Sequence, residues 1–207
     1  MRVLLVRHAE PLSAGRLDHE LAPSDEENAL SDEGQRQSQA LGRMLEAGDF
    51  DRAEFHCSPI RRAQDTFLIA TKDRGRIACI DSRLAELRLN MVPMRTMAQV
   101  RAEQIEAYMA PESSVHSSES VVDHKARVSQ FFDEVINPRR QDSRTLVIVA
   151  HGGTIEHLLG CFIGSLPSAL TSYFTAMPCC AYHELANVAP VPGRCVWRLD
   201  RVSALVR

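Results

Sequence analysis

The stretch "RTLVIVAHGGTIEHLLGCFIG", residues 144–164, determines the fold class that the sequence predicts. Its apolar run from 146 to 150 is typical of a buried strand, and the apolar spacing after Gly153 is typical of a helix. A strand that leads directly into a helix is the repeating unit of parallel sheets covered by helices. Because the strand ends at His151, a polar side chain is expected at the edge of the sheet.

The same alternation of strands and helices continues towards both ends of the chain. Ser31 suits the N-cap of a helix that stops at Gly48, and Ser58 suits the N-cap of another helix with Pro59 in its first position. The pattern predicts an α/β fold in one domain of residues 1–207, a three-layer sandwich with a mostly parallel central sheet and helices on both faces. Strands are expected over 3–6, 52–58, 77–80 and 145–150, helices over 30–48, 58–73, 95–109, 119–136 and 153–164, and short strands with turns over 171–201.

The composition is that of a globular protein without a strong charge bias. Its 207 residues are enough for one domain with a sizeable core, and the formal net charge of −3 gives no reason to expect a nucleic acid or an anionic membrane as partner. The first apolar run is shorter than the core of a secretory signal, about 7–15 residues, and no run approaches the roughly 18 residues that span a bilayer. We therefore expect a cytoplasmic protein whose six cysteines are reduced.

Polar side chains follow three of the predicted strands at the point where each strand ends. Arg7 and His8 end the first strand, the segment "SPIRR" (58–62) follows the second, and His151 and Gly152 follow the strand of residues 145–150. Ligands of such sheets bind beyond the carboxyl ends of the strands. We therefore expect two imidazoles, two or more guanidiniums and a helix N-terminus to converge at one edge of the sheet.

This set of side chains suits a phosphate dianion better than a metal ion. Arginines would repel a metal cation, and the thiolates or carboxylates that usually accompany histidine ligands are missing from the three motifs. Arginine binds phosphoryl oxygens bidentately, a neutral imidazole can attack phosphorus, and a protonated one can stabilise the transferring group. A carboxylic acid would still have to protonate the leaving alcohol. We expect neither a metal nor an organic cofactor.

Five motifs in the right order resemble the histidine phosphatase superfamily, which includes the cofactor-dependent phosphoglycerate mutases and many small phosphatases. They are "LLVRHAEP", "ALSDEGQRQSQALG", "CSPIRRAQDT", "RLAEL" and "VIVAHGGTIEHLL". The resemblance covers roughly residues 2–185 and implies a phosphoglycerate mutase-like fold. It also implies that His8 is the nucleophile that becomes phosphorylated and that Arg7 binds the phosphate. The spacing of the third motif places the family's next arginine at Arg62 rather than at its neighbour Arg61.

The resemblance assigns three further residues to the site. His151 corresponds to the second catalytic histidine, with the Gly152 amide beside it as a donor, and Glu86 corresponds to the proton donor. The stretch "ESVVDHKAR" (119–127) resembles a helical signature of the family, in which Glu119 and Arg127 are expected to be structural. The chain departs from the family after the acid, where "LRLNMVPM" (87–94) replaces the usual G-x-W-E-G.

The predicted function is that of a phosphomonoesterase acting through phosphohistidine on a small phosphorylated metabolite or a phosphoprotein. One alternative is a phosphoglycerate-type phosphomutase, although only 32 residues separate Glu86 from Glu119 and such mutases carry a longer insertion there. Another is a non-catalytic phosphate-binding member of the family. The oligomeric state stays open. So do the roles of four residues between 88 and 118, which either contact the substrate or are ordinary solvated side chains: Arg88, Arg95, Arg101 and His116.

Overall fold

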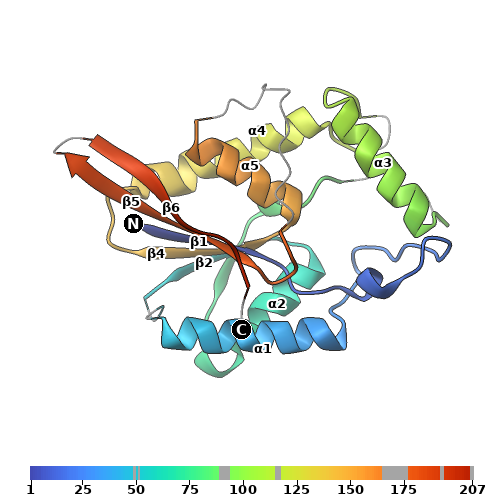
Figure 1. Cartoon of the computed structure of the whole chain (residues 1–207), viewed down its shortest axis with the longest axis horizontal. Helices are drawn as coiled ribbons and strands as arrows, with labels where there is room; N and C mark the ends of the chain where they lie inside the picture. The colour runs from blue at the N-terminus through green and yellow to red at the C-terminus, as the bar shows by residue number, and fades with distance from the viewer. Residues whose placement is uncertain are drawn as a thin grey trace.

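The computed structural model describes residues 1–48, 50, 52–88, 94–114, 118–164, 177–191 and 194–205. Within these residues the chain forms one six-stranded sheet in the order β3-β2-β4-β1-β5-β6 (Figure 1). The first four strands in this order are parallel to one another. Strand β5 is antiparallel to β1, and β6 is antiparallel to β5. The strands are β1 (Arg2–Arg7), β2 (Glu54–Cys57), β3 (Ala78–Ile80), β4 (Thr145–Ala150), β5 (Tyr182–Val191) and β6 (Arg194–Ala204).

Helices cover both faces of this sheet, so the predicted three-layer α/β sandwich is confirmed. In Figure 1, α1 and α2 lie on one side of the sheet, α4 and α5 lie on the other, and α3 stands at the end of the molecule. The helices are α1 (Asp32–Ala47), α2 (Arg61–Thr71), α3 (Met97–Met109), α4 (Val121–Phe131) and α5 (Gly152–Phe162). Short helical turns are η1 (Leu12–Gly15), η2 (Lys72–Arg74), η3 (Ser82–Leu84), η4 (Phe132–Ile136) and η5 (Asn137–Arg139).

Strand β1 supplies both halves of the core because successive side chains of a strand point to opposite faces. Val3 and Leu5 pack with the residues of α4 and α5, whereas Leu4 and Val6 pack with those of α1 and α2. All four side chains are fully buried. A strand buried on both faces reads as a continuous apolar run, as expected for a parallel sheet between two helical layers.

The start of α1 follows the prediction, whereas the start of α2 does not. The Ser31 hydroxyl accepts from the Gly34 N–H at 3.0 Å and α1 ends before Gly48, as predicted. The prediction that Ser58 caps α2 is wrong, because α2 begins at Arg61. The Ser58 hydroxyl faces a histidine instead, as described below.

The C-terminal strands are longer than predicted. The sequence favours short strands over 171–201, but β5 and β6 form a hairpin of ten and eleven residues, and residues 171–176 lie outside the described part of the chain. The pairing of β5 with β1 extends to Ala186, and the Asn187 N–H then donates to the Met1 carbonyl at 2.8 Å. In the described residues no helix is long and apolar enough to cross a membrane.

Candidate active site

His8 and His151 lie side by side because the strands that precede them are neighbours in the sheet. Arg7 of β1 is in register with Ala150 of β4, and the His8 N–H donates to the Ala150 carbonyl at 2.9 Å. The two imidazole centroids are 5.1 Å apart, with an angle of 57° between the rings. Both side chains are buried. The structure therefore brings together the two histidines that the sequence places at separate strand ends.

The hydrogen bonds of His8 determine which ring nitrogen carries its proton. Nδ1 lies 2.8 Å from the Ala9 carbonyl, which can only accept, so Nδ1 is the donor. Nε2 lies 3.2 Å from Nε of Arg62 and accepts from it. Burial first, then the guanidiniums of Arg62 and Arg7, hold the pKa of His8 well below its usual value despite the Ala9 carbonyl. The ring is therefore neutral, with the Nε2 lone pair facing the site.

Helix α2 holds Arg62 next to His8. The Thr66 hydroxyl of α2 accepts from the Ala9 N–H at 2.9 Å and donates to the Arg62 carbonyl at 2.7 Å. This hydroxyl therefore connects the first turn of α2 to the segment that follows His8. The guanidinium of the neighbouring Arg61 has a different partner, since its Nη1 donates to the Glu26 carbonyl at 2.9 Å. Of the two adjacent arginines, the structure thus brings Arg62 to the imidazole.

Arg7 and Arg62 also bond to residues other than His8 and His151. Nη1 of Arg62 bonds to Oδ1 of Asp25 at 2.5 Å, and Nη1 of Arg7 donates to the Met177 carbonyl. Nε of Arg7 is buried without a hydrogen-bond partner among the described residues. A carbon added to Gly152 would lie 3.9 Å from that Nε, so the start of α5 lies against the Arg7 guanidinium.

His151 is bound by Ser58, a contact that the sequence did not reveal. Its Nε2 lies 2.7 Å from the Ser58 Oγ, while its Nδ1 is buried without a partner among the described residues. Burial first, then the charge of Arg62 and the nearby imidazole of His8, hold the pKa of His151 well below its usual value. Its ring is therefore neutral in the free site, whereas the sequence suggested a protonated one. Ser58 is in the quoted third motif, but only the sheet geometry shows that it faces His151.

Glu86 lies at the N-terminus of α5. Its Oε2 accepts from the Gly153 N–H at 3.0 Å and its Oε1 accepts from the Leu87 N–H at 3.0 Å. A carbon added to Gly153 would come within 2.6 Å of both Oε1 of Glu86 and the Tyr108 hydroxyl. Position 153 therefore requires glycine so that the carboxylate can approach the helix end. Burial first, then the charges of Glu86 and Glu156, raise the pKa of Tyr108.

Residues 3–186 match the family described as histidine phosphatase superfamily (branch 1). This match covers most of the chain and includes every candidate site residue named above. The chain belongs to the histidine phosphatase superfamily. None of the curated proteins is a significant match to this histidine phosphatase.

Solved structures similar to this histidine phosphatase include two phosphatases. One is mycobacterial glucosyl-3-phosphoglycerate phosphatase in complex with VO3, which is 25% identical over 98% of both chains, with a TM-score of 0.71. The other is a putative alpha-ribazole-5'-P phosphatase from Escherichia coli, 22% identical over 99% of this chain and 98% of that chain, with a TM-score of 0.72. The family match and the 25% identical structure confirm the predictions of the family and of a phosphatase. Both solved structures confirm the phosphoglycerate mutase-like fold.

Most candidate residues of this histidine phosphatase open into one cavity of about 1490 Å³, whereas the buried side chain of His151 is not part of its lining. Its lining includes Arg7, His8, Arg62, Glu86 and Gly152 together with residues of α3. No three His, Cys, Asp or Glu side chains in the described part of the chain are placed to hold a metal ion. Arg7 and Arg62 therefore bring positive charge to the cavity near His8, and Glu86 and Glu156 bring carboxyl groups to it near α5.

All three arginines that the sequence left open line the cavity. Arg95 also pairs with Glu103 of α3, and Arg101 pairs with Asp18 at the surface. The side chain of Arg88 is exposed. His116 lies outside the described residues.

Proposed function

We propose that this protein hydrolyses small phosphomonoesters by way of a phosphohistidine at His8. The observation that carries the proposal is the geometry around Nε2 of His8. This atom carries no proton, accepts from Nε of Arg62 at 3.2 Å, and belongs to a ring 5.1 Å from that of His151. A neutral imidazole in contact with a guanidinium is the arrangement that an attack on a phosphate dianion requires.

The phosphate would be bound by donors that have no partner in the free site. Nε of Arg7 and Nδ1 of His151 are buried without partners among the described residues, although buried polar atoms are normally hydrogen-bonded. An oxyanion between them would accept from both. We assign the Gly152 amide at the N-terminus of α5 to the same oxyanion, because helix N-termini favour anions.

In the first step, Nε2 of His8 attacks phosphorus in line with the leaving oxygen. The nitrogen–phosphorus bond forms as the phosphorus–oxygen bond breaks, and the proton of the Glu86 carboxylic acid goes to the leaving alkoxide. Arg7, Arg62 and His151 stabilise the equatorial oxygens as their negative charge spreads. The products of this step are an alcohol, phospho-His8 and the Glu86 carboxylate.

In the second step, the Glu86 carboxylate removes a proton from water while the water oxygen attacks phosphorus. The nitrogen–phosphorus bond breaks, its electron pair returns to Nε2 of His8, and inorganic phosphate leaves. Glu86 is then protonated again, so one residue acts first as acid and then as base. The cycle consumes one ester and one water and needs no metal or organic cofactor.

The substrate class and the domain organisation follow from different observations. The two phosphatases described above are named for small phosphorylated metabolites, and we propose a substrate of that class here.

We also propose that residues 1–207 act as a single domain, because the central sheet combines strands from both ends of the chain. The cytoplasmic location stays a prediction.

A screen of phosphomonoesters tests this function, with the wild type and His8→Ala assayed side by side for released inorganic phosphate. We expect turnover of one or more small phosphorylated metabolites by the wild type and none by the variant. A phosphoglycerate isomerisation assay primed with bisphosphoglycerate identifies a mutase instead. Full activity of His8→Ala towards p-nitrophenyl phosphate would contradict the proposal.

A further inference from the structure

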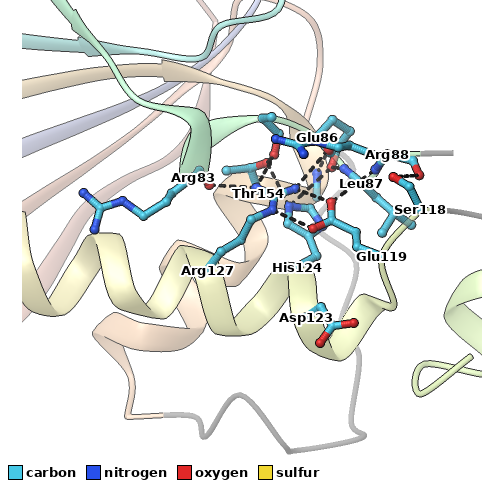
Figure 2. Close-up of polar contacts among 12 residues, drawn as sticks. Arg83, Glu86, Leu87, Arg88, Ser118, Glu119, Asp123, His124, Arg127 and Thr154 are labelled. Carbon is cyan, nitrogen blue, oxygen red and sulfur yellow. Dashed lines mark hydrogen bonds and ion pairs between the residues drawn. The ribbon is translucent and has the colours of Figure 1, made fainter. Parts of the chain in front are cut away.

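We propose that Arg127 and His124, three residues apart on α4, position the carboxyl group of Glu86 for proton transfer. This inference rests on the proposed function, in which Glu86 is the proton donor. Residues three apart on a helix share one face. Figure 2 shows both side chains extending from α4 towards the segment that carries Glu86. Neither side chain is needed for the two chemical steps themselves.

All five N–H groups of the Arg127 guanidinium are hydrogen-bonded, three of them to the main chain of residues 83–86. Nη1 donates to the carbonyls of Arg83 and Ala85 at 2.8 and 2.7 Å, and Nη2 donates to the carbonyl of Glu86 at 3.0 Å. The other two bonds go to Glu119, from Nε at 2.8 Å and from Nη2 at 2.6 Å. Arg127 therefore holds the main chain on the N-terminal side of Glu86 and at Glu86 itself.

Glu119, which is bound to Arg127, also holds the main chain on the C-terminal side of Glu86. Its Oε1 also accepts from the Arg88 N–H at 3.3 Å, and the Arg88 carbonyl accepts from the Ser118 N–H at 2.8 Å (Figure 2). The main chain is thus held before, at and after Glu86. Beyond the short turn η3, residues 85–88 belong to no helix or strand, so these contacts hold a stretch of chain without regular structure.

His124 supports the same segment through Thr154. Its Nε2 lies 3.1 Å from the Thr154 Oγ1, and that hydroxyl gives its one proton to the Ala85 carbonyl at 2.9 Å. Nε2 must therefore carry the proton in this contact, and it lies 3.9 Å from Oε1 of Glu86. The ring is fully buried and packs edge-on against His157, with centroids 4.6 Å apart.

The charge state of His124 explains what it can do for Glu86. Burial first, then the charges of His157 and Arg127, hold its pKa well below the usual value, so the ring is neutral. A neutral ring beside Glu86 adds no charge that would fix the carboxyl group as an anion, and Glu86 has to be both protonated and ionised during the cycle. Because the Gly153 and Leu87 amides bind its two oxygens, a shift of the main chain would move the carboxyl away from them.

The dependence of rate on the leaving group tests this positioning role. An alkoxide needs a proton to leave, whereas 2,4-dinitrophenolate leaves without one. We expect His124→Leu and Arg127→Lys to lower kcat/KM about 10–100-fold for an alkyl phosphomonoester and less than about 3-fold for 2,4-dinitrophenyl phosphate. His124→Gln keeps an N–H donor and should recover most of the loss. Asp123→Asn is the matched control on α4, because Asp123 points away from the cluster (Figure 2) and should leave both rates unchanged.

Equal losses on both substrates would overturn the inference, because they would indicate a merely structural role for α4. Glu86→Gln separates this failure from that of the proposed function. If Glu86→Gln lowers both rates equally, the proton-donor role itself is wrong. If its loss is confined to the alkyl ester while His124→Leu has no such selectivity, only the positioning role is wrong. Circular dichroism checks that each variant folds. If Arg127→Lys does not fold, His124→Leu and His124→Gln alone decide the outcome.

Discussion

The Oγ atom of Ser58 lies 2.7 Å from Nε2 of His151, and the same oxygen accepts from the Ile60 N–H at 3.2 Å. Because a backbone N–H already occupies a lone pair of this oxygen, its proton is free to point at the imidazole. A neutral His151 that accepts this proton at Nε2 must carry its own proton on Nδ1. That nitrogen is the buried one without a partner, so we predict that Ser58 selects the tautomer with a donor at Nδ1, which the proposed function assigns to the phosphate.

Replacing Ser58 by alanine should therefore weaken the stabilisation by His151 without removing the imidazole. A hydrogen bond contributes about 0.5–1.5 kcal/mol net, so we expect kcat/KM to fall about 3–10-fold. The inhibition constant of vanadate, which imitates the transferring group, should rise by a similar factor. Wild-type values of both constants in Ser58→Ala would show that the hydroxyl does not select the tautomer.

The two adjacent arginines of α2 offer a matched pair of variants. Arg62→Ala removes the guanidinium that contacts His8, and the loss of one positioned donor typically lowers the rate about 10²–10³-fold. Arg61→Ala removes a side chain bound to the Glu26 carbonyl and to Asp65, and should retain nearly full activity. Steady-state kinetics on one substrate suffices. The opposite order of losses would place the phosphate at Arg61.

Gly153→Ala should impair proton transfer by displacing the acid. The added carbon would lie 2.6 Å from Oε1 of Glu86, so the carboxylate has to leave its bond with the residue 153 amide. A shift of that size costs about 100-fold in rate when the group acts in the chemical step. The control is Gly15→Ala, where the added carbon meets no atom within 4 Å. An alkyl phosphomonoester is the substrate to use, and unchanged kcat/KM in Gly153→Ala would contradict the position of Glu86.

The buried histidines predict how stability depends on pH. Burial is the main reason that His8, His124, His151 and His157 have lowered pKa values, about 3 for His157. The unfolded chain takes up these protons below its ordinary histidine pKa of 6.5, whereas the folded chain does not. The free energy of unfolding is therefore level above about pH 6.5 and falls below it, by about 1.4 kcal/mol per pH unit for each histidine.

Urea unfolding at a series of pH values measures this dependence. Carboxylates titrate mainly at lower pH, so the range from about pH 5 to pH 6.5 reports the histidines. His124→Leu should reduce the slope in this range by about one proton. A slope equal to that of the wild type would mean that His124 is protonated in the folded protein.

The sequence predicts the architecture of the phosphate site better than its details. Apolar runs that end in Arg7-His8 and in His151 are local signals, and the rule for parallel strands brings their ends together. The choice of Arg62 over Arg61 needed the family motif, since helix periodicity alone does not distinguish them. Ser58 was misassigned because the sequence Ser-Pro is also a typical helix start, and only the sheet geometry shows which role applies.

The side-chain contacts around Glu86 could not be predicted from the sequence, for a different reason. His124 lies on a helix 38 residues after the acid, and its contact with Thr154 depends on how α4 packs against α5. No periodic pattern encodes such a pair. Likewise, the ion pair of Arg101 could only be assigned once α3 was placed near Asp18, and that of Arg95 once the residues before α3 were placed beside Glu103. Long-range side-chain contacts, rather than secondary structure, separate the predicted site from the observed one.

Trapping the phosphoenzyme tests the central claim most directly. The wild type and His8→Ala are mixed with a ³²P-labelled phosphomonoester, quenched in alkaline denaturant and digested, and the labelled peptides are identified. We predict one acid-labile, alkali-stable label on the peptide that contains His8, and none in the variant. Turnover by the wild type without any label on His8, or the same label in His8→Ala, would contradict a phosphohistidine at this residue.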